Sequence, residues 1–182
     1  FSIVTYTGTG SQTTVGHGLG VKPKLIITKL RDTTTQDWMI YPKQITGNGA
    51  TYIKLNTSDG PASDAHTYPN VEPTSTVYTI GGDDGGNGTN GNGSKYVAYC
   101  WSEVENYSKF GIYKGNGNTN GTFVYTGFAP SMLWYWKLSG ENRHILDFAR
   151  DPLNPNTLGI DINRDAAEAD DSNLAIDFLS NG

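Results

Sequence analysis

Two glutamates near the middle of the chain, Glu103 and Glu105, have the spacing that best suits catalysis. They lie two positions apart at the end of "YVAYCWSEV", a stretch with strand composition, so both carboxylates are expected on one face about 7 Å apart. Glycosidases use two carboxyl groups about 5 to 9.5 Å apart. Sandwich-fold glucanases with such a pair carry a third acid, whereas Asn106 and Tyr107 follow here, which favours a solvated strand end.

A glycine-rich loop between residues 81 and 93 offers oxygen ligands for a cation. Its carboxylate and amide side chains are Asp83, Asp84, Asn87, Asn90 and Asn92. Calcium binds such oxygens, so Ca²⁺ is the one cofactor that this loop could hold. The spacing matches no fixed motif, and a plain hairpin loop is the favoured interpretation.

Aromatic side chains form a third candidate site. The residues concerned are Trp38, Tyr41, Trp134 and Trp136. Strand alternation places Trp134 and Trp136 on the same face. Exposed aromatic rings stack on sugars and carboxylates or amides bind sugar hydroxyls, so these residues, together with Asp83, Asp84 and Asn87, are candidates for glycan binding. Packing in the core is the alternative.

The remaining reactive residue types lack a partner in the sequence. The three histidines, His17, His66 and His144, are scattered singly, without the spacing of a zinc site. His17 in "GHGLG" has the surroundings of a turn residue bonded to backbone. Cys100 is the only cysteine and is expected to be a buried free thiol. No serine occupies a Gly-x-Ser-x-Gly elbow. The sequence therefore predicts no metal centre and no enzyme.

Short strands are the elements that must position these residues. Glycine makes up 23 of 182 residues and charged residues only 17%, while aromatics reach 12%. Apolar or alternating runs of strand length, such as "KLIITKL", "FGIYK", "FVYTGF" and "LAIDFL", are separated by glycine, asparagine, aspartate and proline. This pattern predicts an all-β sandwich of the concanavalin-like jelly-roll type, with at most one helical turn, between Arg164 and Asn173.

Charge and hydropathy exclude two classes of partner. The formal charge of −5 and the pI near 5.0 do not suit a surface that neutralises phosphates, so nucleic acid is not expected as a partner. No apolar run reaches the roughly 18 to 20 residues that span a bilayer, so no membrane is expected either.

The chain also repeats itself. "YTGTG" at Tyr6 returns as "YKGNG" at Tyr113, 107 residues later, and the same offset pairs Gly8 with Gly115, Gly10 with Gly117, Gly20 with Gly127 and Pro23 with Pro130. We expect one domain, 1–182, built from two related copies at about 1–106 and 107–182. The second copy lacks a counterpart of "YVAYCWSEV" and is expected to be incomplete, with an open strand edge.

Three longer stretches carry a resemblance to a known family. They are "TVGHGLGVKPKLIITKLR", "YVAYCWSEVENYSKFGIYKGNG" and "FVYTGFAPSMLWYW". Through them the chain resembles an uncharacterised domain found in tail and fibre proteins of bacteriophages, especially marine ones. The resemblance implies a virion protein and supplies no catalytic residues.

The expected function is therefore that of a non-enzymatic virion module. We expect a tail-fibre or tail-associated domain at the virion surface, outside the cell, that attaches to a host-surface glycan. Its partners would be other virion subunits, and it would form a homo-oligomer such as a trimer. The alternatives are a capsid decoration or fibre protein, and a glycan-depolymerising hydrolase that uses Glu103 and Glu105.

Overall fold

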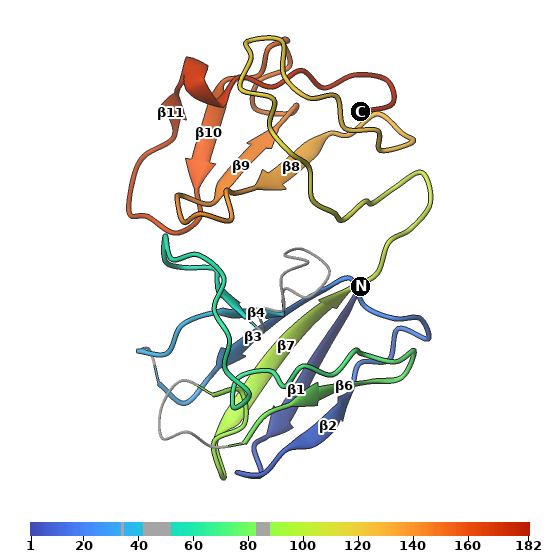
Figure 1. Cartoon of the computed structure of the whole chain (residues 1–182), viewed down its shortest axis with the longest axis vertical. Helices are drawn as coiled ribbons and strands as arrows, with labels where there is room; N and C mark the ends of the chain where they lie inside the picture. Colours follow the sequence, from blue (N-terminus) through green and yellow to red (C-terminus); the bar gives the residue numbers. More distant parts are fainter. Residues whose placement is uncertain (34, 42–51, 83–87) are drawn as a thin grey trace.

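The regular secondary structure consists almost entirely of antiparallel strands. The computed structural model describes residues 1–33, 35–41, 52–82 and 88–182 (Figure 1). The strands in these ranges are β1 (Ser2–Thr7), β2 (Thr13–Gly16), β3 (Leu25–Leu30), β4 (Met39–Tyr41), β5 (Ile53–Lys54), β6 (Val77–Ile80), β7 (Lys95–Trp101), β8 (Met132–Tyr135), β9 (His144–Asp147), β10 (Leu158–Asp161) and β11 (Ala169–Asp170). Helical structure in the described ranges is limited to one 3₁₀ turn, η1 (Ser172–Leu174). The all-β prediction is confirmed.

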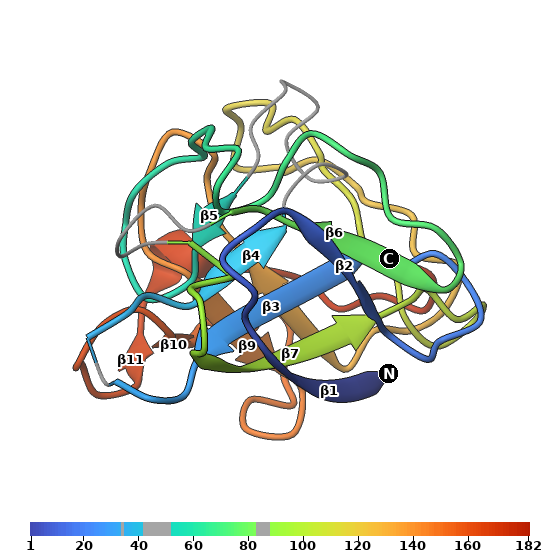
Figure 2. The same cartoon turned by 90° about the horizontal axis from the view of Figure 1, so that it is seen from below.

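The strands form three sheets in layers. A five-stranded sheet, in the order β1-β7-β3-β4-β5, occupies the middle. The ribbon β2-β6 covers one face of it, and the four-stranded sheet β11-β10-β9-β8 lies on the side of its other face (Figures 1 and 2). We call residues 1–106 the first half and 107–182 the second half. The layers agree with the predicted β-sandwich.

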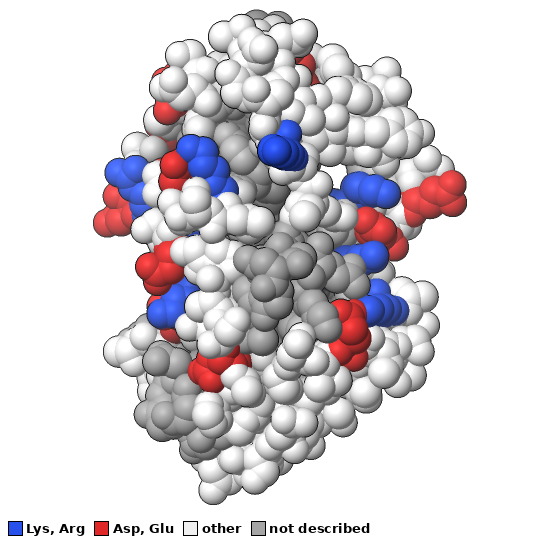
Figure 3. Space-filling view, viewed as in Figure 1, with Lys and Arg blue, Asp and Glu red and all other residues white. Residues whose placement is uncertain are grey.

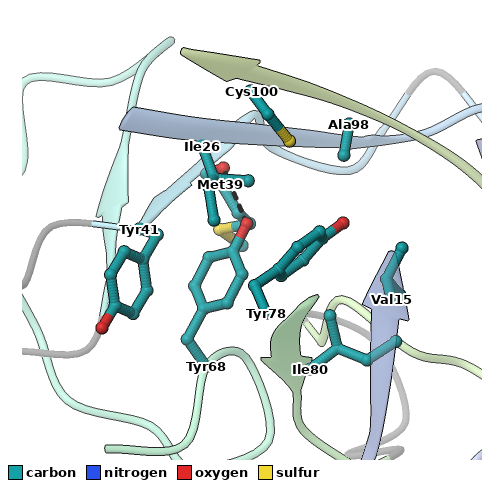
Figure 4. Packing of buried hydrophobic residues seen from close by; sticks show 9 residues of the cluster. All are labelled: Val15, Ile26, Met39, Tyr41, Tyr68, Tyr78, Ile80, Ala98 and Cys100. Carbon is teal, nitrogen blue, oxygen red and sulfur yellow. Dashed lines mark hydrogen bonds between the residues drawn. The ribbon is translucent and has the colours of Figure 1, made fainter. Parts of the chain in front are cut away.

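The inner core fills the space between the ribbon and the five-stranded sheet. Its buried members are Val15, Ile26, Met39, Tyr41, Tyr68, Tyr78, Ile80, Ala98 and Cys100 (Figure 4). Tyr68 is fully buried, and its hydroxyl donates to Thr28 Oγ1 at 2.7 Å. This hydrogen bond offsets the cost of burying a polar group. From Tyr96 to Trp101, β7 alternates buried and half-buried residues, as a strand of period two requires.

Cys100 is expected to resist thiol reagents in the folded protein. Its side chain is fully buried in the inner core, and burial raises the pKa of the thiol to about 12. The thiolate is the reactive form and is scarce at neutral pH, so an aromatic disulfide reagent should label Cys100 only after unfolding in guanidinium chloride. Rapid labelling of the native protein would contradict this assignment. The predicted buried free thiol is confirmed.

A second cluster, which we call the seam, joins the two halves. The first half contributes the buried side chains of Leu25, Ile27, Ile40, Ile53 and Leu55, and half-buried residues of both halves pack against them. The backbones also approach closely here. A Cβ added at Gly140 would lie 2.8 Å from the carbonyl oxygen of Ser58, and Gly140 has a φ of 89°. Since both faces of the five-stranded sheet are covered, the first four residues of β3 are all buried.

Arg143 fastens the second half to the first. The side chain is fully buried and lies over the ring of Trp136, 5.8 Å from its centroid. One terminal nitrogen, Nη1, donates to the carbonyl oxygen of Glu141 at 2.6 Å. The other, Nη2, donates across the seam to the carbonyl oxygens of Lys54, at 3.3 Å, and of Asp59. Burial lowers the pKa of the guanidinium, and the nearby Asp59 carboxylate opposes this shift.

The two larger sheets share a pairing pattern. The matching residue pairs are Ile27 with Ile40 and Ile40 with Ile53 in the first half, and Trp134 with Ile145 and Ile145 with Ile160 in the second. The outer residues of these sets are 107 positions apart, which is the offset of the glycine repeat, and the middle residues are 105 apart. Strands β8, β9 and β10 are therefore paired in the same order and register as β3, β4 and β5.

The repeated glycines adopt the same backbone conformation in both halves. Gly10 and Gly117 have φ angles of 75° and 69°, and Gly20 and Gly127 have 73° and 87°. Residues other than glycine rarely adopt these positive values. These glycines are therefore required by the turns, as the sequence predicted.

Several expected strands are absent from the second half. "FGIYK" and "FVYTGF" lie in the segment from residue 109 to 128, which is described throughout and contains no strand. "LAIDFL" forms only an isolated bridge between Ile176 and Asn156. The physical reason is that a strand needs a continuous row of backbone hydrogen bonds to a neighbour. Among the described residues these segments make only short contacts, such as Ile176 with Asn156 and the Thr126 N–H with the Asn181 carbonyl oxygen.

Candidate functional site

A row of four aromatic rings crosses the seam face of the five-stranded sheet. Trp38 stacks on Tyr99 with ring centroids 6.2 Å apart, and Tyr99 stacks on Trp101 at the same distance. Phe1 tilts against Trp101 at 4.9 Å. Trp38, Tyr99 and Trp101 are half-buried, whereas Phe1 is 63% exposed. We call Phe1, Trp101, Tyr99 and Trp38 the aromatic row.

Strand geometry explains why these rings line up. Tyr99 and Trp101 are two residues apart on β7, so their side chains leave the sheet on the same side. Trp38 stands just before β4, and its backbone is held on both sides. Its N–H donates to Asn56 Oδ1 at 2.8 Å, and its carbonyl oxygen accepts from the Leu55 N–H at 2.9 Å. The row is therefore positioned by the sheet itself.

Polar side chains border the Trp38 end of the row. Lys54 Nζ lies 2.9 Å from Asp37 Oδ2, and Asn56 Nδ2 donates to Asp37 Oδ1 at 2.9 Å. Partial burial acts to raise the pKa of the Asp37 carboxyl, but the hydrogen bonds from Lys54 and Asn56 outweigh it, and the pKa lies below its ordinary value. A partly exposed carboxylate, ammonium and amide beside an indole are the groups that bind sugar hydroxyls.

Trp134 and Trp136 lie on the same face, as expected from alternation, and this face meets the first half. Both pack against the seam. Their indole Nε1 atoms are buried and have no hydrogen-bond partner among the described residues. Since the rings lie against the first half, they support the seam and do not form a free stacking platform.

The other predicted glycan-binding residues have different positions. Tyr41 points to the opposite face of the sheet from Trp38 and belongs to the inner core, with 4% of its surface exposed. Side chains alternate between the two faces along a strand, and Tyr41 lies on the inner-core face. It therefore cannot stack on a ligand. Asp83, Asp84 and Asn87 lie outside the described residues.

The end of the asparagine-rich loop has a structural role. Asn90 is fully buried, and its amide nitrogen donates to the carbonyl oxygens of Ser11 and Gly81 at 2.6 and 2.7 Å. Its Oδ1 accepts from the Thr9 N–H at 2.7 Å. The side chain of Asn90 therefore uses both its amide nitrogen and its oxygen in hydrogen bonds to neighbouring loops, and it offers no calcium ligand in this arrangement.

The two glutamates do not share a strand face, which corrects the premise of the glycosidase alternative. β7 ends at Trp101, and a turn bridged between Val104 and Ser108 follows. Glu103 is half-buried, accepts from the Phe110 N–H at 3.1 Å and lies 3.8 Å from Lys24 Nζ. Glu105 is exposed in the turn. The strand ends here because the chain must turn toward the second half.

His17 and His144 both have polar partners. His17 is fully buried, as the turn interpretation required: its Nδ1 accepts from the Leu19 N–H, and its Nε2 faces the Thr74 carbonyl oxygen, both at 3.2 Å. His144 Nδ1 lies 2.7 Å from Asp161 Oδ1, directly across the β9–β10 pair. In the part of the chain that the structure describes, no group of three histidine, cysteine, aspartate or glutamate residues could hold a metal ion.

Comparison with known proteins places the chain in a family. A family model described as a domain of unknown function, DUF7483, matches residues 1–182. The chain belongs to this family. A comparison with curated proteins and one with solved structures found no match.

Other surface features of this DUF7483 domain say little about a ligand. On the face seen in Figure 3, charged side chains of both signs gather in a belt across the middle, and no single sign dominates. A small pocket beside Thr28, Asp37 and Tyr96 has about 10 Å³ of free space, room for about one water molecule. Within the described residues there is no helix able to cross a bilayer.

The sequence missed three of the four residues in the aromatic row. Trp38 was a candidate, but Phe1, Tyr99 and Trp101 were not. The alternation of β7 gives the signal that could have found two of them, since Tyr99 and Trp101 must share a face. Phe1 carries no such signal, because only the pairing of β1 with β7 brings it against Trp101.

Proposed function

We propose that this domain is a non-enzymatic module of a bacteriophage virion, a structural and host-attachment part of a tail fibre or another tail-associated protein. The sequence resemblance motivates the phage assignment. A structural role is supported by the exposed apolar side chains between Tyr107 and Tyr125, which include Ile112, Tyr113 and Phe123. Exposed apolar side chains gathered in one segment are a feature of protein interaction sites. This apolar surface is the observation that supports the proposal, in which the module lies at the virion surface and packs against other subunits, as in a homotrimer.

The attachment role uses the aromatic row. Phe1 offers exposed ring surface at one end of the row, Trp38 at the other end is half-buried and packs on the seam, and Asp37, Lys54 and Asn56 offer polar groups beside Trp38. A sugar ring can stack on an aromatic face while its hydroxyls bind neighbouring polar groups. A host-surface glycan is therefore the proposed ligand, and no metal or cofactor is required.

The finer fold assignment is part of the proposal. The sandwich would be of the concanavalin-like jelly-roll type, and the domain 1–182 would derive from two copies, about 1–106 and 107–182. The shared register of β3-β4-β5 and β8-β9-β10 and the matching φ angles of the repeated glycines support a common origin.

Two alternative functions are a capsid decoration protein and a glycan-depolymerising hydrolase. A capsid decoration protein would use the same exposed apolar surface. A glycan-depolymerising hydrolase would need Glu103 and Glu105 beside one substrate. The hydrogen bond from the Phe110 N–H and the proximity of Lys24 tie Glu103 to its own turn, which supports the non-enzymatic proposal.

A glycan array should distinguish the proposed attachment from a purely structural role. We expect the wild-type domain to bind a subset of bacterial surface glycans, and Phe1→Ala and Trp38→Ala to lose that signal because each removes ring surface from the row. Tyr107→Ala is the matched control, since Tyr107 is an exposed aromatic residue outside the row. A blank array with folded protein, or equal loss in the control, would contradict glycan attachment.

Location and activity need separate measurements. Immunogold labelling with antibodies against the domain is expected to mark the tails of intact phage particles; labelling confined to capsids would favour the decoration alternative. Release of reducing ends from host polysaccharide, abolished in Glu103→Gln, would overturn the non-enzymatic assignment.

A further inference from the structure

The edge of β8 is open where the corresponding edge of β3 is covered. Along β3, six residues from Leu25 to Leu30 pair with β7, and β1 pairs with the far side of β7. β8 stands in the second half where β3 stands in the first, and it pairs with β9 on one side. Among the described residues no strand pairs with its other side. Among the described residues, the second half therefore has no strand equivalent to β7.

The counterpart of β1 is also unpaired. By the 107-residue offset, β1 corresponds to residues 109–114, which form no strand. Tyr6 of β1 stacks on Tyr96 of β7 at 5.1 Å, and its hydroxyl donates to the Thr89 carbonyl oxygen. The corresponding Tyr113 is 54% exposed, and Ile112 beside it is 57% exposed. Tyr113 is thus exposed where its counterpart Tyr6 is half-buried against β7, whereas Ile112 corresponds to Thr5, which is exposed on β1 as well.

The segment 109–114 nevertheless stays close to β8. Phe110 packs on the seam together with Trp134 of β8. Burial raises the pKa of the Tyr135 hydroxyl on β8, and the nearby Tyr113 adds to this shift. If a strand paired with β8, residues 109–114 would be expected on the other side of that strand, as β1 lies on the other side of β7 from β3.

Gly115 provides an independent indication of a missing neighbour. At its counterpart, Gly8, an added Cβ would lie 2.1 Å from the carbonyl oxygen of Gly91, so only glycine allows the two backbones to approach. At Gly115 nothing lies within 4 Å of the added Cβ, and its φ is not in the positive region. The free domain gives no reason for a glycine here. A second backbone packed against Gly115 would give one.

We propose that the open edge of β8 and the segment 109–114 form an acceptor site for one extended strand of a partner polypeptide. The occupant has the chemistry of β7: about seven extended residues with alternating apolar side chains, preceded by a glycine-rich turn. Backbone hydrogen bonds to the acceptor edge supply affinity, and the alternating side chains supply specificity. The proposal concerns assembly and does not depend on glycan binding or on a phage origin.

A second copy of this chain is a poor donor. Its own β7 is paired along its length with both β1 and β3, so donating it would dismantle the first half. We therefore assign the donor strand to a partner polypeptide and not to the β7 of a second copy.

A peptide titration tests the acceptor site. The probe is a fluorescein-labelled peptide with the sequence of residues 90–101, carrying Cys100→Ser to prevent disulfide exchange, followed by fluorescence anisotropy against the purified domain. We expect saturable 1:1 binding. A peptide with proline at the position of Ala98 should bind at least about tenfold more weakly, because proline removes a ladder hydrogen bond. No binding, or equal binding of the proline peptide, overturns the proposal.

The Gly115→Ala variant distinguishes strand addition from non-specific binding of the peptide. The added methyl group meets open space in the free domain, so its melting temperature should match the wild type. In the complex it should meet the peptide backbone and weaken binding at least about tenfold, as Gly8 predicts. Unchanged affinity overturns the proposed register. A domain that forms dimers without peptide, and releases them when peptide is added, would show that a second copy occupies the edge and would overturn the choice of partner. The glycan array is unaffected by either result.

Discussion

Replacing Arg143 with alanine is expected to lower the free energy of unfolding by about 3 kcal/mol or more. Hydrogen bonds to a charged group contribute about 1.5 to 3 kcal/mol each. The substitution leaves the carbonyl oxygens of Lys54 and Asp59 without their donor and removes the packing on Trp136. For a chain of this length the melting temperature should fall by roughly 10 °C. Urea unfolding followed by tryptophan fluorescence measures the loss.

Arg164→Ala is the matched control for this prediction. Arg164 lies in the same half, with a side chain 55% exposed, and pairs loosely with Asp161 at 3.4 Å. An exposed pair of this kind contributes at most about 1 kcal/mol. If Arg143→Ala cost no more than Arg164→Ala, the buried guanidinium would not be what holds the halves together.

Gly8→Ala is expected to have an effect of similar size for a different reason. The new methyl carbon would lie 2.1 Å from the Gly91 carbonyl oxygen and 2.9 Å from the Asn90 carbonyl carbon. Both are backbone atoms, and the same backbone is fixed by the hydrogen bonds from the Gly8 N–H to Ser94 and from the Gly93 N–H to Gly8. The start of β7 must therefore move away from β1, at a cost of about 3 kcal/mol.

The repeat supplies the control for Gly8→Ala within the same chain. Gly115 occupies the corresponding position in the second half, and nothing lies within 4 Å of its added Cβ. Gly115→Ala should therefore change the free energy of unfolding by less than about 0.5 kcal/mol. Equal destabilisation by the two substitutions, measured in the same urea titration, would mean that glycine is needed at these positions for backbone freedom and not for the close approach of β7.

Local chemistry in the sequence determined the class of fold and several single residues. The glycine and asparagine turns between short alternating runs predicted an all-β protein, because those residues supply the backbone angles that reverse a chain. The alternation around Cys100 predicted its burial, and the turn "GHGLG" predicted that His17 bonds to backbone. The turns, and the hydrogen bond from the Leu19 N–H to His17 Nδ1, depend on residues close in the chain, and the alternation of buried and half-buried residues is a property of the strand itself. A single sequence therefore reports them well.

Only the tertiary structure decided which face each residue presents and to what. Alternation predicts that the side chains of Trp38, just before β4, and Tyr41, at the end of β4, lie on opposite faces of the sheet. It does not predict which face packs in the inner core and which in the seam. Arg143 looks like a surface residue in the sequence and is fully buried, with Nη2 bonded to backbone carbonyls of the distant first half. Residues 109–114 have the pattern of a strand and form none. A strand is stable only when another backbone accepts its hydrogen bonds, and that partner is set by the whole arrangement of the chain and not by the strand's own residues.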